Sequence, residues 1–423
     1  MIQLPDDFVE QTRRTLGETL WTRFLQAMEE EPPVSIRLNP VKAATFDVAT
    51  PSAQSVPWCK DGFYLQGRPP FTFDPLLHAG AYYVQEASSM FLDHVLRQYV
   101  ASPVLMLDLC AAPGGKSTAA IAALPEGSRL VSNEPNPKRA QILSENIQKW
   151  GSPDVTVTNS YPRDFRKNGA QFDVVLTDVP CSGEGMFRKD EGAIGEWSRE
   201  NVEKCWRLQR EIVADAWECL VPGGLYIYST CTFNTQEDEE NVRWMTEELG
   251  AEILNVETES EWHITGSLLK DFHAPVYRFI PGTSRGEGLF MAVMRKPGRQ
   301  EVRQMKRPVL KGVKTILDGV KAPLQKGRDV IPDVSEALST TFQQGKYPLA
   351  ELTYEQAVAY LRKEAVVLDS GVPKGIVAVA YRGLPLGFAK NIGTRANNLY
   401  PAEWKIKSTH LPDKVEIIVK KNE

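Results

Sequence analysis

Between residues 104 and 296 the chain alternates short apolar runs with amphipathic stretches, and this alternation constrains the fold more than any other feature. The runs are VLMLDL (104–109), RLVSN (129–133), VTVT (155–158), FDVVLTD (172–178), GLYIYST (224–230) and GLFMAVMRK (288–296). Such alternation predicts a doubly wound α/β sheet whose strands are joined by helices. We expect the run at 288–296 to be the last strand.

Several residues mark where the intervening helices begin and end. Gly151 follows the helical stretch 137–150 and should end it. Ser198 is a good N-cap for the next helix, which carries apolar residues at i+3 and i+4 steps up to Leu220. We also expect a helix to begin at Asn234, with Glu237 three residues on, as in a capping box.

Two further segments flank this α/β region, so the sequence predicts three domains. Residues 1–97 are numerous enough for a small α+β domain, and residues 98–298 hold the predicted sheet. Residues 299–423 begin with a polar, basic linker and continue as a small strand-rich domain. In that domain, residues 375–393 predict a hairpin that turns at Arg382-Gly383.

The charge of the chain is divided unevenly between these segments. The formal net charge is −5 overall, but residues 1–295 hold 27 Lys and Arg against 41 Asp and Glu, a balance of −14. Residues 296–423 hold 22 against 13, a balance of +9. A basic domain on an acidic one is expected when one part of a protein binds phosphate groups, although a solvated lysine-rich surface would have the same composition.

The cysteines and the apolar runs exclude several classes of protein. The six cysteines are spread along the chain with no CxxC pair, so we expect neither a zinc site nor a disulfide framework. No run approaches the roughly 18 apolar residues of a membrane helix, and the acidic N-terminus is unlike a signal peptide. We expect a cytoplasmic, monomeric protein without a membrane partner.

The first strand leads into a glycine loop, LDLCAAPGGKST (107–118). Gly114 and Gly115 allow the backbone to approach a ligand closely, and the start of the following helix offers free N–H groups. The loop matches neither GxGxxG nor GxxxxGK[ST], which argues against a dinucleotide enzyme or a phosphate loop. Residues Cys110, Ala111, Ala112, Pro113, Gly114, Gly115 and Lys116 are therefore candidates for binding another cofactor.

An acid follows the second strand, where Glu134 lies 26 residues after Asp108. A carboxylate at this position commonly accepts hydrogen bonds from the two hydroxyls of a ribose. The alternative is an acid that only favours the N-terminus of the next helix through the helix dipole.

Two of the six cysteines follow neighbouring strands. Cys181 comes after the fourth strand, in TDVPCSGEGMFRKD (177–190), and Cys231 after the fifth, in YSTCTFNTQEDEEN (228–241). The carboxyl ends of neighbouring strands line the ligand crevice of an open α/β sheet, so both thiols should face one pocket. Cys205 and Cys219 lie in the amphipathic helix, and we expect them to be core residues.

Four motifs in this order resemble the NOL1/NOP2/Sun family of RNA cytosine-C5 methyltransferases, namely AAPGGK, DVPCSGEGMFRKD, STCTFNTQEDEEN and PGTSRGEGLFMA (281–292). The closest likeness is to its bacterial branch that acts on small-subunit ribosomal RNA. SIRLNP (35–40), GAYYVQEASSM (80–90) and YRGLPLGFAKNIGTRANNLYP (381–401) extend the resemblance over nearly the whole chain. It implies a Rossmann-like class I methyltransferase sheet, an N-terminal domain of an RNA-binding type and a PUA-like C-terminal domain that binds RNA.

The resemblance also implies roles for individual residues. Cys231 would be the nucleophile and Cys181 would assist product release, with S-adenosyl-L-methionine bound by the loop 110–116, Glu134 and Asp178. A thiol is useful here because cytosine C5 is too poor a nucleophile until a thiolate adds to C6. Asp178, protonated or hydrogen-bonded to N3 and the exocyclic amine, would offset the charge that addition drives into the ring.

The chain departs from the family at one cofactor contact. Many relatives have an acid after the third strand that meets the adenine amine, and Tyr161 stands there in this sequence. Either a neighbour such as Asn159 makes that contact, or packing and backbone groups hold the adenine.

Three other functions fit parts of the pattern. In a DNA cytosine-C5 methyltransferase Cys181 would be the nucleophile, but such an enzyme has no need of Cys231. A catalytically silent RNA-binding or assembly factor should have lost a cysteine, the acid at 178 or the glycine loop, and all are present. An adenine N-methyltransferase would have [ND]-P-P-[YF] where this chain has Asp178-Val179-Pro180-Cys181.

Overall fold

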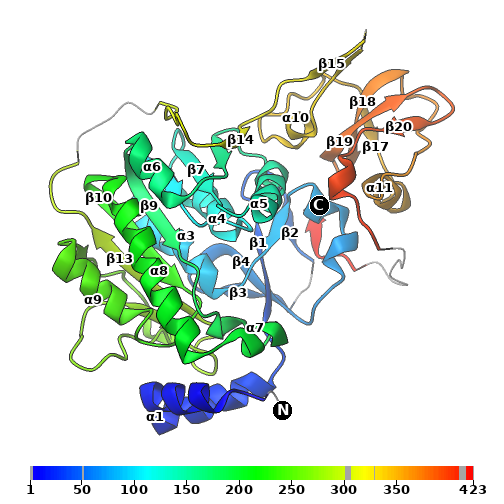
Figure 1. The fold of residues 1–423 in the computed structure, drawn as a ribbon. Coiled ribbons are helices and arrows are strands. Elements are labelled where there is room, and N and C mark those ends of the chain that lie inside the picture. Colours follow the sequence, from blue (N-terminus) through cyan, green and yellow to red (C-terminus); the bar gives the residue numbers. More distant parts are fainter. Residues whose placement is uncertain (1–2, 50–51, 301–305, 328, 409–415, 423) are drawn as a thin grey trace.

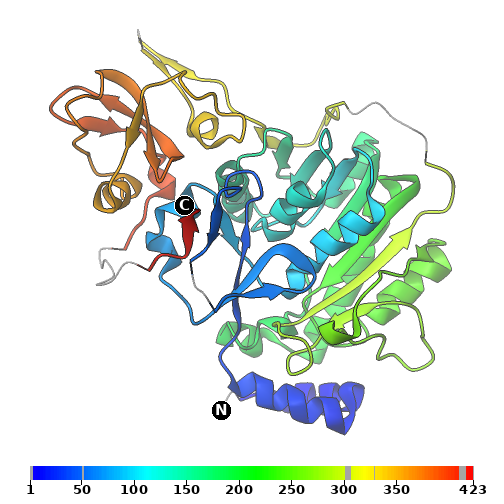
Figure 2. The same ribbon diagram turned by 180° about the vertical axis from the view of Figure 1, so that it is seen from behind.

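The computed structural model describes residues 3–49, 52–300, 306–327, 329–408 and 416–422. A nine-stranded sheet forms its centre, and Figure 1 shows helices on both faces of this sheet, helix α1 below it and the C-terminal strands beside it. The same arrangement is seen from behind in Figure 2. No helix in the described ranges is long and apolar enough to cross a membrane.

The strand order makes the sheet doubly wound. In space the strands are β11 (Glu252–Ile253), β13 (Leu289–Arg295), β10 (Leu220–Thr230), β9 (Phe172–Asp178), β6 (Leu105–Asp108), β7 (Arg129–Asn133), β8 (Val155–Thr158) and β14 (Thr315–Asp318), while β12 (Tyr277–Phe279) pairs with β13. The five strands from β10 to β8 are parallel. The chain runs from β6 outward to β8 and then returns to β9 on the other side of β6, so the predicted fold class is confirmed.

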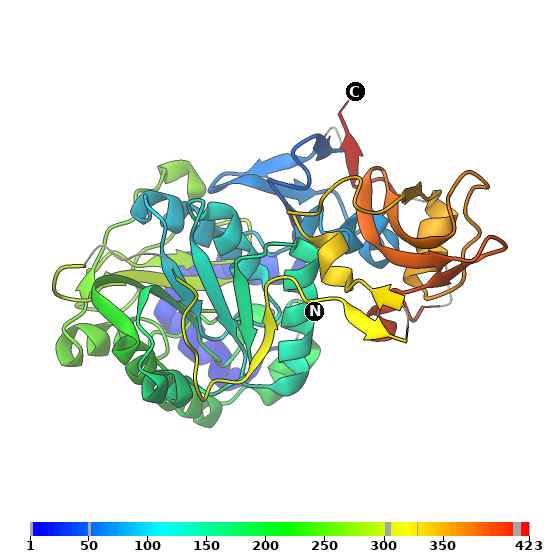
Figure 3. The same ribbon diagram turned by 90° about the horizontal axis from the view of Figure 1, so that it is seen from above.

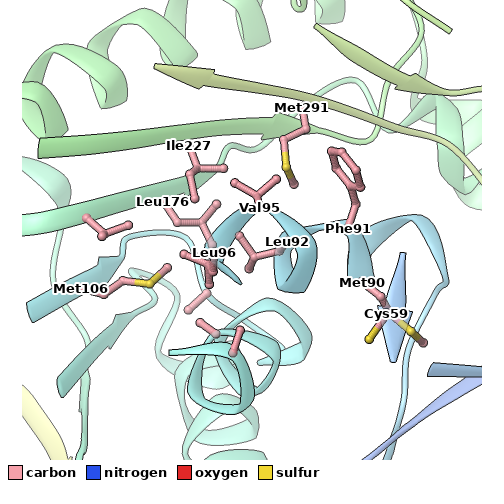
Figure 4. Packing of buried hydrophobic residues seen from close by; sticks show 14 of the residues in the cluster. Cys59, Met90, Phe91, Leu92, Val95, Leu96, Met106, Leu176, Ile227 and Met291 are labelled. Carbon is pink, nitrogen blue, oxygen red and sulfur yellow. The ribbon is translucent and has the colours of Figure 1, made fainter. Parts of the chain in front are cut away.

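Helices cover both faces of the sheet because each presents an apolar stripe to it. On one face lie α3 (Phe91–Tyr99), α4 (Gly115–Ala123) and α5 (Pro137–Trp150); on the other lie α6 (Pro162–Asn168), α8 (Arg199–Glu218) and α9 (Glu239–Glu248). Figure 4 shows Leu92, Val95 and Leu96 of α3 packed toward Leu176 and Ile227 of the sheet. Burial of such side chains is the main contribution to the stability of this layer.

The predicted helix ends are confirmed at two of three positions. Gly151 adopts φ 91° after α5, a conformation that costs glycine little, and the Ser198 hydroxyl accepts a hydrogen bond from Asn201 N at 3.0 Å. The helix expected at Asn234 instead begins at Glu239. The side chains of Asn234 and Glu237 belong to a buried polar network. Residues 235–238 therefore form turns before the helix starts.

The N-terminal segment is an α+β unit, as predicted. Helix α1 (Asp6–Glu29) is kinked at Gly17, where φ is 70°. A four-stranded sheet follows, in the order β3 (Gln54–Val56), β4 (Cys59–Leu65), β1 (Val34–Leu38) and β5 (Tyr82–Val84). The short helix α2 (Pro75–His78) lies between β4 and β5 in the chain.

The C-terminal segment is strand-rich, also as predicted. Its sheet has the order β17 (Leu349–Glu351), β18 (Gly375–Tyr381), β19 (Leu384–Asn391) and β20 (Ala396–Asn398), with α11 (Tyr354–Leu361) between β17 and β18 in the chain. The turn between β18 and β19 has Arg382 at φ 52° and Gly383 at φ 82°, which confirms the predicted hairpin. The hairpin β15 (Leu324–Lys326) and β16 (Asp329–Ile331) and helix α10 (Val334–Leu338) precede it.

The last described strand returns to the start of the chain. Strand β21 (Val419–Lys421) pairs antiparallel with β2 (Phe46–Val48), and Ile418 and Val419 are buried among apolar residues of the N-terminal unit. Figure 3 shows the strands of the N-terminal unit beside the C-terminal unit, with α1 behind the central sheet. The N- and C-terminal units are thus held together by backbone hydrogen bonds.

One prediction about the sheet is wrong. The run at 288–296 forms β13, but β14 joins the opposite edge of the sheet by pairing antiparallel with β8. Part of the basic segment expected to be a linker is therefore a strand of the central sheet. The division into 1–97, 98–298 and 299–423 stays a proposal, and α3 extends through its first boundary.

Candidate active site

The predicted site residues lie together at the carboxyl end of the parallel strands. The glycine loop follows β6, Glu134 follows β7, Asp178 ends β9, and the two cysteines lie in the loops after β9 and β10. Strands β6 and β9 are neighbours at the point where the strand order reverses. Ligands of open α/β sheets bind in the crevice formed at such a switch point.

The glycine loop is shaped by its own backbone and pinned by α5. Gly114 adopts φ 113° just before α4 begins at Gly115, a conformation that side chains rarely allow. Arg139 of α5 donates to the Ala112 carbonyl at 2.7 Å, and Asn146 donates to the Pro113 carbonyl at 2.8 Å. The loop therefore presents a fixed backbone surface above the first turn of α4.

Asp108 lies beneath this loop and is completely buried. Its Oδ2 accepts a hydrogen bond from the Ser117 hydroxyl at 2.6 Å, while Oδ1 has no partner among the described residues. Burial raises the pKa of Asp108 to about 7. An unpartnered acceptor below a glycine loop fits a ligand that brings its own donor, such as an ammonium group or a hydroxyl.

Glu134 is nearly buried where β7 ends, and the structure already gives its carboxylate partners. Its Oε1 accepts from Asn136 N at 2.9 Å, and its Oε2 lies 3.4 Å from Arg139 Nη1. Asn136 is the N-cap of α5, so Glu134 also organises the start of that helix. Its predicted contact with a ribose remains a proposal.

The N-terminal unit reaches under the glycine loop, which the sequence did not reveal. The Arg37 guanidinium of β1 is fully buried, donates to Thr118 Oγ1 at 2.6 Å and to Gln85 Oε1 at 2.8 Å, and stacks 4.5 Å from the Trp150 ring centre. Tyr83 also lies beside the start of α4, because a Cβ at Gly115 would be in ordinary van der Waals contact with its ring, at 3.5 Å. In the sequence, only the family resemblance of SIRLNP (35–40) and GAYYVQEASSM (80–90) marked the segments that contain these residues.

Lys116 and Asp178 connect the loop to the end of β9. Lys116 Nζ lies 2.8 Å from Asp178 Oδ2, and the Ser229 hydroxyl donates to Asp178 Oδ1 at 2.7 Å. Burial alone would lower the pKa of Lys116, but the adjacent Asp178 carboxylate outweighs it and the pKa is raised. Lys116, predicted as a cofactor residue, is therefore a cation held on Asp178.

The two predicted thiols face each other. Cys181 Sγ lies 3.2 Å from Cys231 Sγ, and Cys231 N donates to Cys181 Sγ at 3.4 Å. The hydrogen bond with Cys231, together with burial, raises the pKa of Cys181. Cys181 therefore stays a thiol near neutral pH and can donate a proton or a hydrogen bond to the Cys231 sulfur.

Cys110 lies in the glycine loop, and the remaining three cysteines lie outside the two loops that carry this pair. Cys219 is buried in the cluster on the α8 face, as predicted, whereas Cys205 on the same helix is only partly buried. Cys59 is buried in the N-terminal unit. Among the described residues, no group of His, Cys, Asp or Glu could hold a metal ion.

The two candidates for the adenine contact already have structural roles. The Asn159 amide nitrogen donates to the Glu134 and Pro135 carbonyls, both at 2.9 Å, and so closes the end of β7. Tyr161 is the N-cap residue of α6 and is 57% exposed. The structure therefore favours neither side chain for that contact.

This fold and this site define an S-adenosylmethionine-dependent methyltransferase, and comparisons with known proteins agree. A model described as 16S rRNA methyltransferase RsmB/F matches residues 101–295. The N-terminal domain of 16S rRNA methyltransferase RsmF matches residues 4–87, and the methyltransferase RsmF PUA domain matches residues 348–406. The chain belongs to the RsmB/F family of 16S rRNA methyltransferases, which confirms the family resemblance and makes S-adenosyl-L-methionine its cofactor.

Individual relatives support the same assignment. The ribosomal RNA small subunit methyltransferase F of Pectobacterium atrosepticum is 32% identical over 70% of this chain and 63% of its own length. The Enterobacter protein of the same name is 29% identical over 94% of this chain and 95% of its own. A solved methyltransferase homologue from Pyrococcus horikoshii, 25% identical, has a TM-score of 0.58 and covers 70% of this chain and 96% of that one.

Proposed function

We propose that this chain transfers a methyl group to C5 of a cytosine in RNA, and that small-subunit ribosomal RNA is its substrate. The observation that carries the proposal is the pair of thiols 3.2 Å apart beside Asp178. Methyl transfer to nitrogen or oxygen needs no thiol, whereas cytosine C5 becomes nucleophilic only after addition to C6. The relatives named for the small ribosomal subunit support the choice of RNA.

The cofactor S-adenosyl-L-methionine supplies an electrophilic methyl group. We place its site at residues 110–116, Glu134 and Asp178, above the buried carboxylate of Asp108. The N–H groups at the start of α4, the open backbone at Gly114 and the unpartnered Asp108 Oδ1 fit such a ligand. A carboxylate at Glu134 fits the two hydroxyls of its ribose.

The residues of this chain would activate cytosine by covalent addition. The Cys231 thiolate forms a bond to C6 and pushes an electron pair to C5, which becomes an enamine carbon. Asp178, oriented by Lys116 and Ser229, accepts a hydrogen bond from the exocyclic amine and so orients the ring, while the Lys116 ammonium beside it offsets the negative charge that addition places on the ring.

Product release reverses the addition. After methylation, water takes the C5 proton, the electron pair of the C5–H bond re-forms the C5–C6 double bond, and the Cys231 sulfur leaves C6 as a thiolate. Cys181 is a thiol held 3.2 Å from that sulfur, so it can hydrogen-bond to the departing thiolate and make it a better leaving group. This assignment of attack to Cys231 and release to Cys181 follows the family resemblance and is supported by the raised pKa of Cys181.

The C-terminal unit would supply affinity for RNA. Its balance of charge is positive, and among its described bases Lys374, Arg395, Lys405 and Lys407 are exposed. Exposed bases bind phosphate in a salt-dependent way that does not require a catalytic group. Ribosomal RNA as substrate would place the protein in the cytoplasm.

The proposal is tested by identifying the methylated nucleoside. The purified protein is incubated with small-subunit ribosomal RNA and methyl-labelled S-adenosylmethionine, and the RNA is digested to nucleosides. We expect the label in 5-methylcytidine, and none with Cys231→Ala. Label in an N-methylated nucleoside, or in DNA under the same conditions, would overturn the proposal.

A further inference from the structure

The loops that carry the two cysteines are joined by carboxylates that cross between them. Glu237, from the loop after β10, accepts from Ser182 N of the other loop at 3.0 Å. Glu184, from the loop after β9, accepts in turn from Phe233 N at 2.6 Å and Asn234 N at 3.1 Å. Each loop thus places a carboxylate on the backbone of its partner, one residue after Cys181 in one loop and two and three residues after Cys231 in the other.

Both carboxylates are buried, and both are fully used. Glu237 is 0% exposed and also accepts from Gln209 Nε2 at 2.7 Å and from Asn234 Nδ2 at 2.8 Å. Glu184 is 1% exposed and accepts from Trp197 Nε1 and Asn234 Nδ2, both at 3.0 Å. Burying a carboxylate is costly unless hydrogen bonds compensate, so two such groups in one place require explanation.

The surrounding contacts restrain the loops from both sides. Gln209 of α8 donates to the Pro180 carbonyl at 3.0 Å as well as to Glu237, and Gly185 N donates to the Cys231 carbonyl at 2.8 Å. On the outer side, the Trp197 and Phe233 rings pack against Phe8 and Phe24 of α1, at 5.5 and 5.3 Å between ring centres. Glu237 binds the amide directly after Cys181, and Glu184 binds the amides two and three residues after Cys231, so the effect of both carboxylates on the thiols passes through the backbone.

We infer that Glu184 and Glu237 are positioning residues that fix the separation of Cys181 and Cys231. The inference rests on the proposed function, in which both thiols act on one cytosine in turn. Cysteine chemistry is sensitive to geometry, because displacements of about 1 Å can lower a rate by about 100-fold. Each carboxylate accepts hydrogen bonds from the backbone of the other loop, and these bonds fix the position of the cysteine which that loop carries.

The test replaces each buried carboxylate, which only accepts hydrogen bonds, by an amide, which also donates them. In Glu237→Gln and Glu184→Gln the side-chain shape is kept, but one acceptor oxygen becomes an amide that faces hydrogen-bond donors. Asp74→Asn is the control, since Asp74 also accepts from a backbone amide, Leu76 N, and from a side chain, Tyr82 OH, but lies in the N-terminal unit.

Two rates report on the separation of the thiols. The first is kcat for methyl transfer, and the second is the rate at which diamide, which accepts two electrons and two protons, converts Cys181 and Cys231 into a disulfide detected by peptide mapping. We expect both rates to fall by about 10- to 100-fold in the two glutamine variants. The affinity for S-adenosyl-L-methionine, measured by calorimetry, should stay unchanged, and the control should keep all three values.

The possible outcomes separate the inference from the proposed function. Wild-type kcat and a wild-type disulfide rate in both glutamine variants would overturn the positioning role and leave the proposed function intact. Absence of 5-methylcytidine with the wild-type protein would overturn the proposed function, whereas the disulfide rate would still report on positioning. If Glu237→Gln fails to fold, the same two rates are measured in Glu237→Asp. This variant keeps the negative charge, but its side chain is one methylene shorter.

Discussion

Lys116 Nζ lies 2.8 Å from Asp178 Oδ2, so the glycine loop and the end of β9 are joined by an ion pair across the crevice. The side chain of Lys116 is 11% exposed and that of Asp178 is 33% exposed, which leaves the carboxylate accessible while the ammonium lies deeper. The pair links the proposed cofactor site to the proposed base-binding site.

Replacing Lys116 should therefore impair catalysis. Lys116→Met would leave Asp178 held by the Ser229 hydroxyl alone, and the loss of a charge-assisted hydrogen bond costs about 1.5–3 kcal/mol. We expect kcat/KM for RNA to fall by about 10- to 100-fold in steady-state assays of methyl transfer. Lys138→Met, at an exposed position on α5, is the matched control and should behave as wild type.

The two cysteines should be separable by their covalent adducts with RNA. Cys231→Ala should abolish methyl transfer and form no adduct, because C6 receives no nucleophile. Cys181→Ala should still add and methylate but stall before release, which leaves a protein–RNA adduct that survives denaturing gel electrophoresis. If only Cys231→Ala formed an adduct, the two roles would be reversed. If Cys181→Ala turned over normally, Cys181 would have only a packing role.

Glu134 should contribute to cofactor affinity. Glu134→Ala would leave ribose hydroxyls unpaired and weaken binding of S-adenosyl-L-methionine by about 1–3 kcal/mol in calorimetry. Because Glu134 also bonds Asn136 at the start of α5, thermal unfolding must be measured on the same sample. Unchanged affinity in a folded variant would remove Glu134 from the cofactor site.

The basic C-terminal unit should control the salt dependence of RNA binding. Replacing Lys374, Arg395, Lys405 and Lys407 by Gln should weaken RNA binding, and the slope of log K against log salt should become shallower by about 0.7–0.9 for each phosphate that is no longer neutralised. The affinity for the cofactor should not change. The exposed Lys204 and Arg207 of α8, replaced in the same way, serve as the control. An unchanged slope in the quadruple variant would mean that these bases form only a solvated surface.

Glu237 should make stability depend on pH. Burial raises the pKa of Glu237 to about 7, above its value in the unfolded chain, so the folded state retains the proton to a higher pH. The stabilisation from this group is therefore full below about pH 4.5 and is lost as the pH rises to about 7. We expect the free energy of unfolding in urea to decrease from pH 5 to 7 more steeply in the wild type than in Glu237→Gln. Parallel profiles would show that Glu237 does not titrate in this range.

The parts of the fold that follow from local pattern were predicted well from the sequence. The strands at 129–133, 155–158 and 172–178 have the predicted bounds, because each is a short apolar run that is buried wherever it pairs. Strand β14 was missed because its four residues, Thr315–Asp318, include only two apolar ones and become a strand only by pairing with β8, far away in the chain. Pairing partners of this kind leave no periodic signal in their own segment.

The residues of the candidate site also fall into those that the sequence predicted and those that it did not. Its thiols and Asp178 were found because reactive groups after neighbouring strands must meet at one edge of the sheet. The sequence did not predict the position of Arg37 under the glycine loop or the hydrogen bonds of Glu184 and Glu237 between the two loops. A charged residue in a short motif is expected at the surface until its partners are known. Burial of these charges depends on contacts between segments that are distant in sequence.

The pairing of β2 with β21 has a consequence for biosynthesis. Ile418 and Val419 complete an apolar cluster whose other members include Ile36, Leu38 and Phe46, so this unit is finished only after Ile418 and Val419 have been translated. Growing chains fold domain by domain from the N-terminus, but in this chain β2 stays unpaired until β21 has been translated. The N-terminal unit should therefore become resistant to proteases on stalled nascent chains only after the central sheet does, although it is translated before that sheet.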